Sequence, residues 1–235
     1  MRRLSRMAAP HWIALYGTIV AAWTLLWVQA APSGTLWEVV LDLCRTPVSG
    51  TGWLSTLAMW LLMSAAMMLP TALPAFATFD EIADAQGVDG GGRLVAGYAV
   101  VWVGFAGLAT LCQTILMPAS LPHAAAAGLL VAAAAYQWTP LKEACLTRCR
   151  QPLTFFMGHW DEGQWRMGMR LGAVCLGCCW ALMALGLIGG LMSLGFMALA
   201  TLLMTLEKLG SGRIVSTLIA CACLTGAGYL IGGLT

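Results

Sequence analysis

The stretch LGAVCLGCCWALMALGLIGGLMSLGFMALATLLMTL, residues 171–206, runs for 36 positions without an Asp, Glu, Lys or Arg. An uncharged apolar run of 18 or more residues is typical of a transmembrane helix. As a single helix this run would be about 54 Å long, which exceeds the ~40–45 Å of a whole bilayer. Glycines near its middle suit a tight turn, and these are Gly186, Gly189 and Gly190. We therefore predict two helices here, the second of them short or re-entrant.

Four other runs also lack charged residues, at 11–37, 46–79, 94–141 and 214–235. Charged residues make up only 9% of the 235 positions and hydrophobic residues 60%, whereas a soluble domain carries roughly 25% charged residues. The net charge of +2 excludes a basic nucleic-acid-binding protein, and the composition excludes a disordered chain. The sequence therefore predicts an all-α, polytopic transmembrane helical bundle that forms a single membrane domain over residues 1–235.

The expected bundle has about seven helices joined by short loops, except for one longer cytoplasmic loop at 142–170. The predicted helices lie at about 11–31, 53–79, 93–117, 122–141, 171–190, 191–207 and 213–234. With the N-terminus in the cytoplasm, all Lys and Arg residues except Arg45 fall on the cytoplasmic side. Because positive residues gather in cytoplasmic loops, the pattern predicts a cytoplasmic N-terminus and a C-terminus on the outside.

The lipid bilayer is the first expected partner of these helices. Their predicted centres contain no carboxylate, Lys, Arg or His. Since intramembrane ionisable residues mark proton relays and charged-substrate paths, their lack argues against a proton-coupled pump. Sulfur is plentiful instead, with 9 Cys and 14 Met in the chain. Thiols and thioethers are therefore the candidate functional groups of the membrane interior.

Two sulfur clusters stand out inside the predicted helices. Met67 and Met68 lie on the 53–79 helix, just before two prolines that bend a helix and free backbone carbonyls. Cys175, Cys178 and Cys179 lie on the 171–190 helix at spacings of three and four, which places them on one face. Soft thiolate and thioether donors select Cu(I), and Zn is a weaker candidate. These five residues are candidate metal ligands if the two helices are neighbours.

A second candidate site lies in the 142–170 loop. Cys145 and Cys149 are four apart and would share a face if the preceding helix continued past the interface. His159 is a further candidate ligand in the same loop. This set has the geometry of a cytoplasmic relay for a metal, and a reduced cytosolic thiol pair beside a basic cluster is the alternative.

Two further features concern the packing of the helices. Gly104 and Gly107 would permit close helix contact. Glu207 and Lys208 would form an ion pair that anchors a helix at its cytoplasmic end.

Several segments together resemble a known family. They are Ala65-Ala66-Met67-Met68-Leu69-Pro70, Tyr98 with Trp102 and Phe105, Tyr136-Gln137-Trp138-Thr139-Pro140-Leu141-Lys142 leading to Cys145 and Cys149, Cys175-Leu-Gly-Cys-Cys-Trp-Ala-Leu-Met183, and Glu207-Lys208. In this order they resemble the DUF2182 family of bacterial integral membrane proteins, which are described as predicted metal-binding proteins. The resemblance covers about residues 50–210 and implies a bacterial inner-membrane location and a role with a metal.

Three functions are compatible with these features. The first is a membrane protein that binds Cu(I) through intramembrane Cys and Met, for copper delivery or homeostasis, with a metallochaperone or a membrane cuproenzyme as partner. The second is a structural or assembly subunit whose sulfur residues only pack, since Met and Cys are adaptable core residues. The third is a membrane thiol or quinone oxidoreductase. The chain lacks a nucleotide-phosphate loop, a Ser/His/Asp set and a zinc-protease His pair, so catalysis is the less favoured interpretation.

Overall fold

The computed structural model describes residues 10–30, 52–88, 90–116, 122–188, 194–210 and 213–232. Within these ranges every regular element is helical and no strand occurs, so the all-α prediction is confirmed for the described chain. The basic N-terminal residues, Arg45 and the glycines at 189 and 190 lie outside the described residues.

The helices of the described chain range in length from the 34 residues of α4 to the 6 residues of α8. They are α2 (Pro10–Ala30), α4 (Trp53–Gln86), α5 (Gly91–Leu111) with the π-helical η1 (Cys112–Leu116), α6 (His123–Gln137), α7 (Pro140–Arg150), α8 (Pro152–Met157), the 3-10 turn η2 (Trp160–Glu162), α9 (Gln164–Ala184) with the 3-10 turn η3 (Leu185–Leu187), α10 (Leu194–Leu209) and α11 (Ile214–Gly232). The sequence predicts a loop at residues 142–170. Much of this segment is helical instead, because α7, α8 and the first turns of α9 occupy it.

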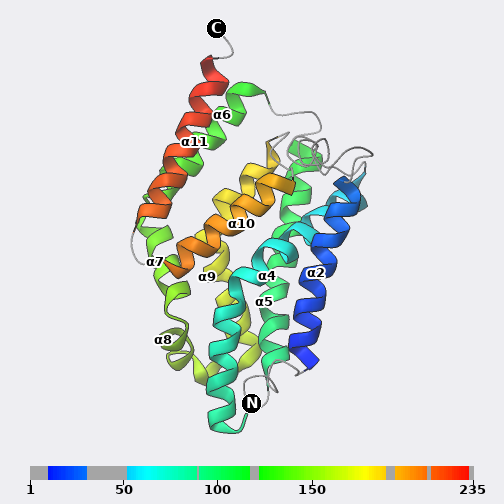
Figure 1. The fold of residues 1–235 in the computed structure, drawn as a ribbon, viewed down its shortest axis with the longest axis vertical. Coiled ribbons are helices and arrows are strands. Elements are labelled where there is room, and N and C mark those ends of the chain that lie inside the picture. Colours follow the sequence, from blue (N-terminus) through cyan, green and yellow to red (C-terminus); the bar gives the residue numbers. More distant parts are fainter. Residues whose placement is uncertain are drawn as a thin grey trace.

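Figure 1 shows how these helices are arranged. α2, α4 and α5 run side by side, α9 packs along α5, and α10 crosses the bundle obliquely between α4 and the α6–α11 pair. α6 and α11 lie against each other at one end, and α7 and α8 lead from α6 back towards α9. The start of α2 and the end of α11 lie at opposite ends of the long axis.

Four helices of the described chain are long and apolar enough to cross a membrane. They are α4, α5 with most of η1, α9 with η3, and α11. α6 and α7 together pass the same test but are bent by 61° between them, and as one broken span they would make a fifth. The structure thus supports four or five spans by length and composition, compared with the seven that the sequence predicts.

The bend between α6 and α7 has a local cause in the sequence Trp138-Thr139-Pro140. A residue before proline is pushed out of the helical region, so α6 ends at Gln137. Proline is favoured at the first helical position, and the Thr139 side chain accepts a hydrogen bond from the Lys142 amide as the N-cap of α7. The chain therefore restarts as a new helix in a new direction, which carries Cys145 and Cys149 onto α9.

The prolines of α4 act as expected on the backbone of that helix. Pro70 has no N–H, so the carbonyl of Ala66, four residues earlier, has no intrahelical partner. The indole Nε1 of Trp23 in α2 donates to this carbonyl across 2.9 Å. A freed backbone group inside the bundle is thus paired with a neighbouring helix, and the bond ties α2 to α4.

α5 and α9 approach each other closely at glycines. A Cβ at Gly97 would lie 2.3 Å from the Trp165 carbonyl oxygen, and one at Gly168 would lie 2.1 Å from the Leu94 carbonyl oxygen. Only residues without a side chain permit this contact. Gly104 and Gly107, which the sequence predicts to permit close helix contact, make no such contact with the described part of the chain, because a Cβ at either position would meet none of its atoms within 4 Å.

Candidate metal centre

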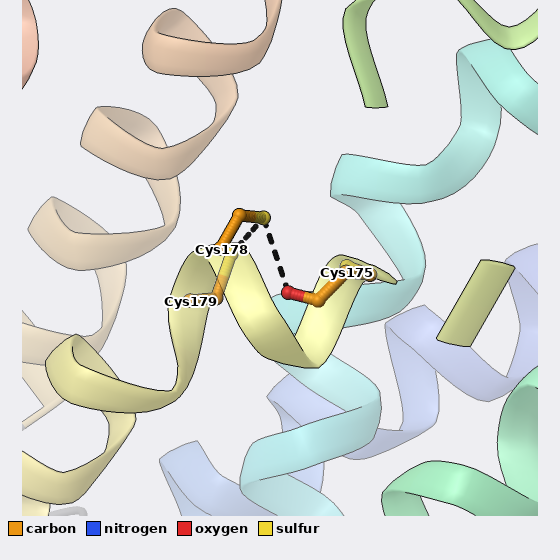
Figure 2. Close-up of side chains that lie close together, drawn as sticks. All are labelled: Cys175, Cys178 and Cys179. Atoms are coloured by element: carbon orange, nitrogen blue, oxygen red, sulfur yellow. Dashed lines mark hydrogen bonds between the residues drawn. The ribbon is translucent and has the colours of Figure 1, made fainter. Parts of the chain in front are cut away.

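Three thiols lie together on α9. Cys175, Cys178 and Cys179 are exposed by only 1–2%, and their sulfurs lie within 4.8 Å of one another. Figure 2 shows them on adjacent turns, with the Cys178 sulfur between the Cys179 side chain and the backbone carbonyl of Cys175. The sulfurs of Cys178 and Cys179 are 3.2 Å apart, and the Cys178 thiol donates to the Cys175 carbonyl across 3.1 Å. The spacing of three and four residues brings all three to one face, as the sequence predicts.

A fourth thiol comes from α7. The sulfur of Cys149 lies 3.9 Å from that of Cys178. The sequence predicts that Cys149 belongs to a separate site in the 142–170 loop, whereas the structure places it beside the α9 thiols. We refer to Cys149, Cys175, Cys178 and Cys179 as the thiol cluster.

The dimensions of the thiol cluster match those of a soft-metal site. Two sulfurs that bind one ion at ~2.3 Å each lie no more than about 4.6 Å apart. The Cys149–Cys178 and Cys178–Cys179 separations of 3.9 and 3.2 Å fall within this limit. Thiolates without carboxylate or imidazole select a soft ion such as Cu(I). The three α9 thiols could therefore hold a metal ion, and the Cys149 sulfur lies within bridging distance of Cys178.

A tyrosine connects the thiol cluster to α4. Tyr98 of α5 is fully buried, and its hydroxyl lies 3.2 Å from the Cys175 sulfur. The same hydroxyl donates to the Met68 backbone carbonyl across 3.1 Å. Phe76 packs edge-on against the Tyr98 ring, with 5.3 Å between the ring centroids. Tyr98 thus links Cys175 to the part of α4 that precedes its two prolines.

A lysine provides a second connection. The Lys208 ammonium, near the end of α10, donates to the Cys175 sulfur across 3.1 Å and to the Thr71 hydroxyl of α4 across 2.7 Å. A cavity of about 140 Å³ adjoins these groups. It is lined by Cys149, Cys175, Tyr98, Thr71 and Lys208, among others. Two of the four thiols are therefore reached from this cavity.

The methionines expected as supporting ligands belong to α4, on the other side of Tyr98 from Cys175. Met67 and Met68 are buried in α4, exposed by 2% and 0%. Met68 meets the site through its backbone carbonyl, and the α4 residues that line the cavity belong to the next turns, from Thr71 to Ala75. α4 and α9 thus face one cavity, with Tyr98 and Lys208 between them.

Two further candidate ligands lie at the edge of the site or beyond it. Cys145 is partly buried against α9, where a Cβ at Gly177 would lie 2.6 Å from its sulfur. His159 bonds through Nδ1 to the Phe155 carbonyl across 2.8 Å and packs its ring on Phe155. These contacts of His159 are those of a packed side chain at a helix end.

A buried polar network holds the end of α10 beside the site. The Lys142 ammonium lies 2.6 Å from a carboxylate oxygen of Glu207, and both side chains are only 1% exposed. Gln137 accepts a hydrogen bond from Lys142, and the Ser216 hydroxyl donates to the same carboxylate. Arg150 donates twice to the Glu207 backbone carbonyl, across 3.0 and 2.8 Å. The prediction of an ion pair between Glu207 and Lys208 is therefore wrong, because Glu207 pairs with Lys142 of α7.

Sequence reasoning missed three of the groups around the cluster: Tyr98, Thr71 and Lys208. Tyr98 and Lys208 belong to segments that the resemblance already includes, but nothing in their spacing assigns them to the thiols. The signal that could have found Lys208 is chemical, since a lysine at the end of an apolar helix, next to a Glu that pairs elsewhere, needs a partner.

Taken together, the fold and the site define a class of protein. It is an all-helical protein with membrane-length helices and a buried cysteine cluster that could bind a metal. The sequence profile of the PpoB2 family, described as a copper chaperone, matches residues 57–231, and the chain belongs to this family. The resemblance to the DUF2182 family implied a role with a metal. Membership of a copper chaperone family confirms that part of the expectation, although the family that matches is named PpoB2 and not DUF2182. No curated protein and no solved structure matches the chain.

Proposed function

We propose that this chain is a polytopic membrane protein that binds Cu(I) at the thiol cluster and passes it to a partner. The observation that carries the proposal is the set of three α9 thiols whose sulfurs lie within 4.8 Å of one another, with the Cys149 sulfur of α7 3.9 Å from that of Cys178. Membership of a copper chaperone family supports the identity of the metal. Copper is the cargo here, so binding must be both tight and reversible.

The thiols have different roles in this proposal. Cys175, Cys178 and Cys179 form the buried part of the site and hold the ion. Cys149 adds a thiol from α7 beside Cys178, and Cys145, one helical turn away on α7 and partly exposed, leads from the surface to this site. Ligand exchange from one thiolate to the next would move the ion between them without releasing it to water. Met67 and Met68 remain candidate thioether ligands for an intermediate on this path, and His159 is the most peripheral candidate.

The proposal includes a location and a partner. The resemblance and the uncharged helices support a bacterial inner membrane, with the α7–α8 segment facing the cytoplasm. A cytoplasmic metallochaperone or a membrane cuproenzyme would exchange copper with the chain. This scheme includes no nucleic-acid partner. Zn is a poorer cargo than Cu(I) for these sulfur ligands.

Copper content tests the proposal directly. Full-length protein is purified in detergent from copper-supplemented cells, as wild type and as the double variant Cys178→Ser/Cys179→Ser. We expect stoichiometric copper in the wild type by inductively coupled plasma mass spectrometry and negligible copper in the variant. Cys223→Ser is the matched control, because Cys223 is also buried, 6% exposed, but lies on α11 outside the cluster. Equal and negligible copper in wild type and double variant would reject copper binding and favour a structural subunit.

The topology is tested separately. We propose seven spans, with the N-terminus in the cytoplasm and the C-terminus outside. Fusion of alkaline phosphatase to the C-terminus should give an active enzyme, and fusion of a cytoplasm-dependent fluorescent protein should stay dark. The reverse result would place the C-terminus inside and exclude seven spans with a cytoplasmic N-terminus.

The short sulfur–sulfur distances also favour a second candidate, a thiol–disulfide oxidoreductase. The Cys149–Cys178 separation is small enough for a disulfide to form after a modest movement, whereas the adjacent Cys178 and Cys179 would form a strained ring if oxidised. Thiol trapping across a redox titration separates the two functions. A pair that titrates between about −300 and −120 mV supports the oxidoreductase, and its absence excludes it.

A further inference from the structure

The charge beside the thiol cluster bears on which ions it accepts. The Lys208 ammonium lies 3.1 Å from the Cys175 sulfur, in direct contact with a candidate ligand. An ion bound to that sulfur at ~2.3 Å would lie no more than about 5.4 Å from the ammonium nitrogen. Any metal bound at Cys175 would therefore experience the field of a fixed positive charge.

The structure restrains Lys208 in this position. Its ammonium also donates to Thr71 across 2.7 Å, on the opposite helix α4. The preceding residue, Glu207, is held through its carboxylate by Lys142 and through its backbone carbonyl by Arg150. The end of α10 is thus anchored on two sides, and the Lys208 side chain reaches inward from an anchored backbone.

The repulsion between this ammonium and a bound ion grows in proportion to the charge of the ion. A divalent ion is therefore penalised twice as strongly as a monovalent one at the same distance. The surrounding groups are buried, so water and salt screen the interaction far less than at a surface. A fixed positive charge beside soft ligands thus selects by charge, whereas the thiols select by softness.

We infer that Lys208 is a specificity-determining residue, which makes the thiol cluster favour a monovalent soft cation over a divalent soft cation. The inference rests on the proposed function, because it concerns the ion that the thiols hold. In this scheme the thiols select a soft ion, and Lys208 excludes the divalent ions that thiols also bind.

The test uses Ag(I) and Cd(II), because both are soft d10 ions with equal electron counts and differ by one unit of charge. Full-length wild type, Lys208→Gln and Lys208→Arg are purified in detergent without metal. The dissociation constant for each ion is measured by competition with a small thiol chelator. In Lys208→Gln we expect the preference for Ag(I) over Cd(II) to fall by at least about tenfold, mainly through tighter Cd(II) binding. Lys208→Arg keeps the charge and should keep the preference within about threefold.

The outcomes separate a charge effect from a structural one. If Lys208→Gln binds both ions with an unchanged ratio of affinities, or loses both equally, Lys208 is not a selectivity residue and the inference is overturned while metal binding stands. If the wild type binds neither ion, the proposed function fails and the inference with it. Folding is checked by gel filtration and circular dichroism, and Lys208→Met replaces Lys208→Gln in the same comparison if the latter does not fold.

Discussion

The sulfurs of Cys149 and Cys178 lie 3.9 Å apart although 29 positions separate them in the chain. Cys149 is in the last turn of α7, and Cys178 is in the middle of α9. The contact exists because Thr139 and Pro140 start α7 in a new direction, 61° away from α6. It joins what the sequence presents as two separate thiol sites into one.

This contact predicts a specific cross-link. Mild oxidation of the purified chain with diamide should join Cys149 to Cys178, because the sulfurs need to approach by only about 2 Å to reach bonding distance. Trypsin cuts between the two cysteines at Arg150, Arg166 and Arg170, so the disulfide would link two peptides that non-reducing mass spectrometry can identify. The linked pair should be missing from oxidised Cys149→Ser. Its absence from oxidised wild type would contradict the placement of α7 on α9.

Cys149 should matter for copper more than Cys145 does. Only Cys149 contacts a thiol of the α9 set, whereas Cys145 lies against Gly177 at the edge. We expect Cys149→Ser to weaken Cu(I) binding by at least about tenfold, which corresponds to about 1.4 kcal/mol. Cys145→Ser should change the affinity by less than about threefold. Competition with a Cu(I)-specific chelator measures both, and equal losses in the two variants would argue against Cys149 as a ligand.

The α5–α9 contact predicts a sharp difference between two glycines. Gly168→Ala places a methyl group 2.1 Å from the Leu94 carbonyl oxygen, so the helices must separate. We expect a loss of about 1–3 kcal/mol or more in the free energy of unfolding. Gly104→Ala is the matched control, because a Cβ there meets nothing within 4 Å. Thermal unfolding in detergent, followed by circular dichroism, compares them, and equal midpoints would show that the helices do not touch at Gly168.

The buried ion pair between Lys142 and Glu207 predicts a rescue. Lys142→Met leaves the Glu207 carboxylate, 1% exposed, without its cation, and we expect a loss of about 3–5 kcal/mol. Lys142→Met/Glu207→Gln removes both charges and keeps an acceptor for the Ser216 hydroxyl. The double variant should therefore be more stable than the single one. Thermal midpoints of the two purified proteins decide this, and a double variant no more stable than Lys142→Met would exclude an unpaired charge as the cause.

The sequence by itself determined the class of fold and the α9 part of the site. Uncharged runs of membrane length cannot satisfy their backbone groups except as helices, so an all-α bundle follows from composition alone. Cys175, Cys178 and Cys179 share a face because their spacing matches the helical repeat. Pro70 likewise implies a free carbonyl at Ala66, although not that Trp23 would pair with it.

Only the tertiary structure decided which distant groups meet those thiols. Cys149, Tyr98 and Lys208 come from three other helices, and their positions depend on the bend at Pro140, the glycine contact of α5 with α9 and the anchored end of α10. Helical spacing fixes neighbours within a helix, whereas the crossing of two helices depends on the fit of whole surfaces. For that reason the sequence reveals thiols on a face but not the lysine and tyrosine that surround them.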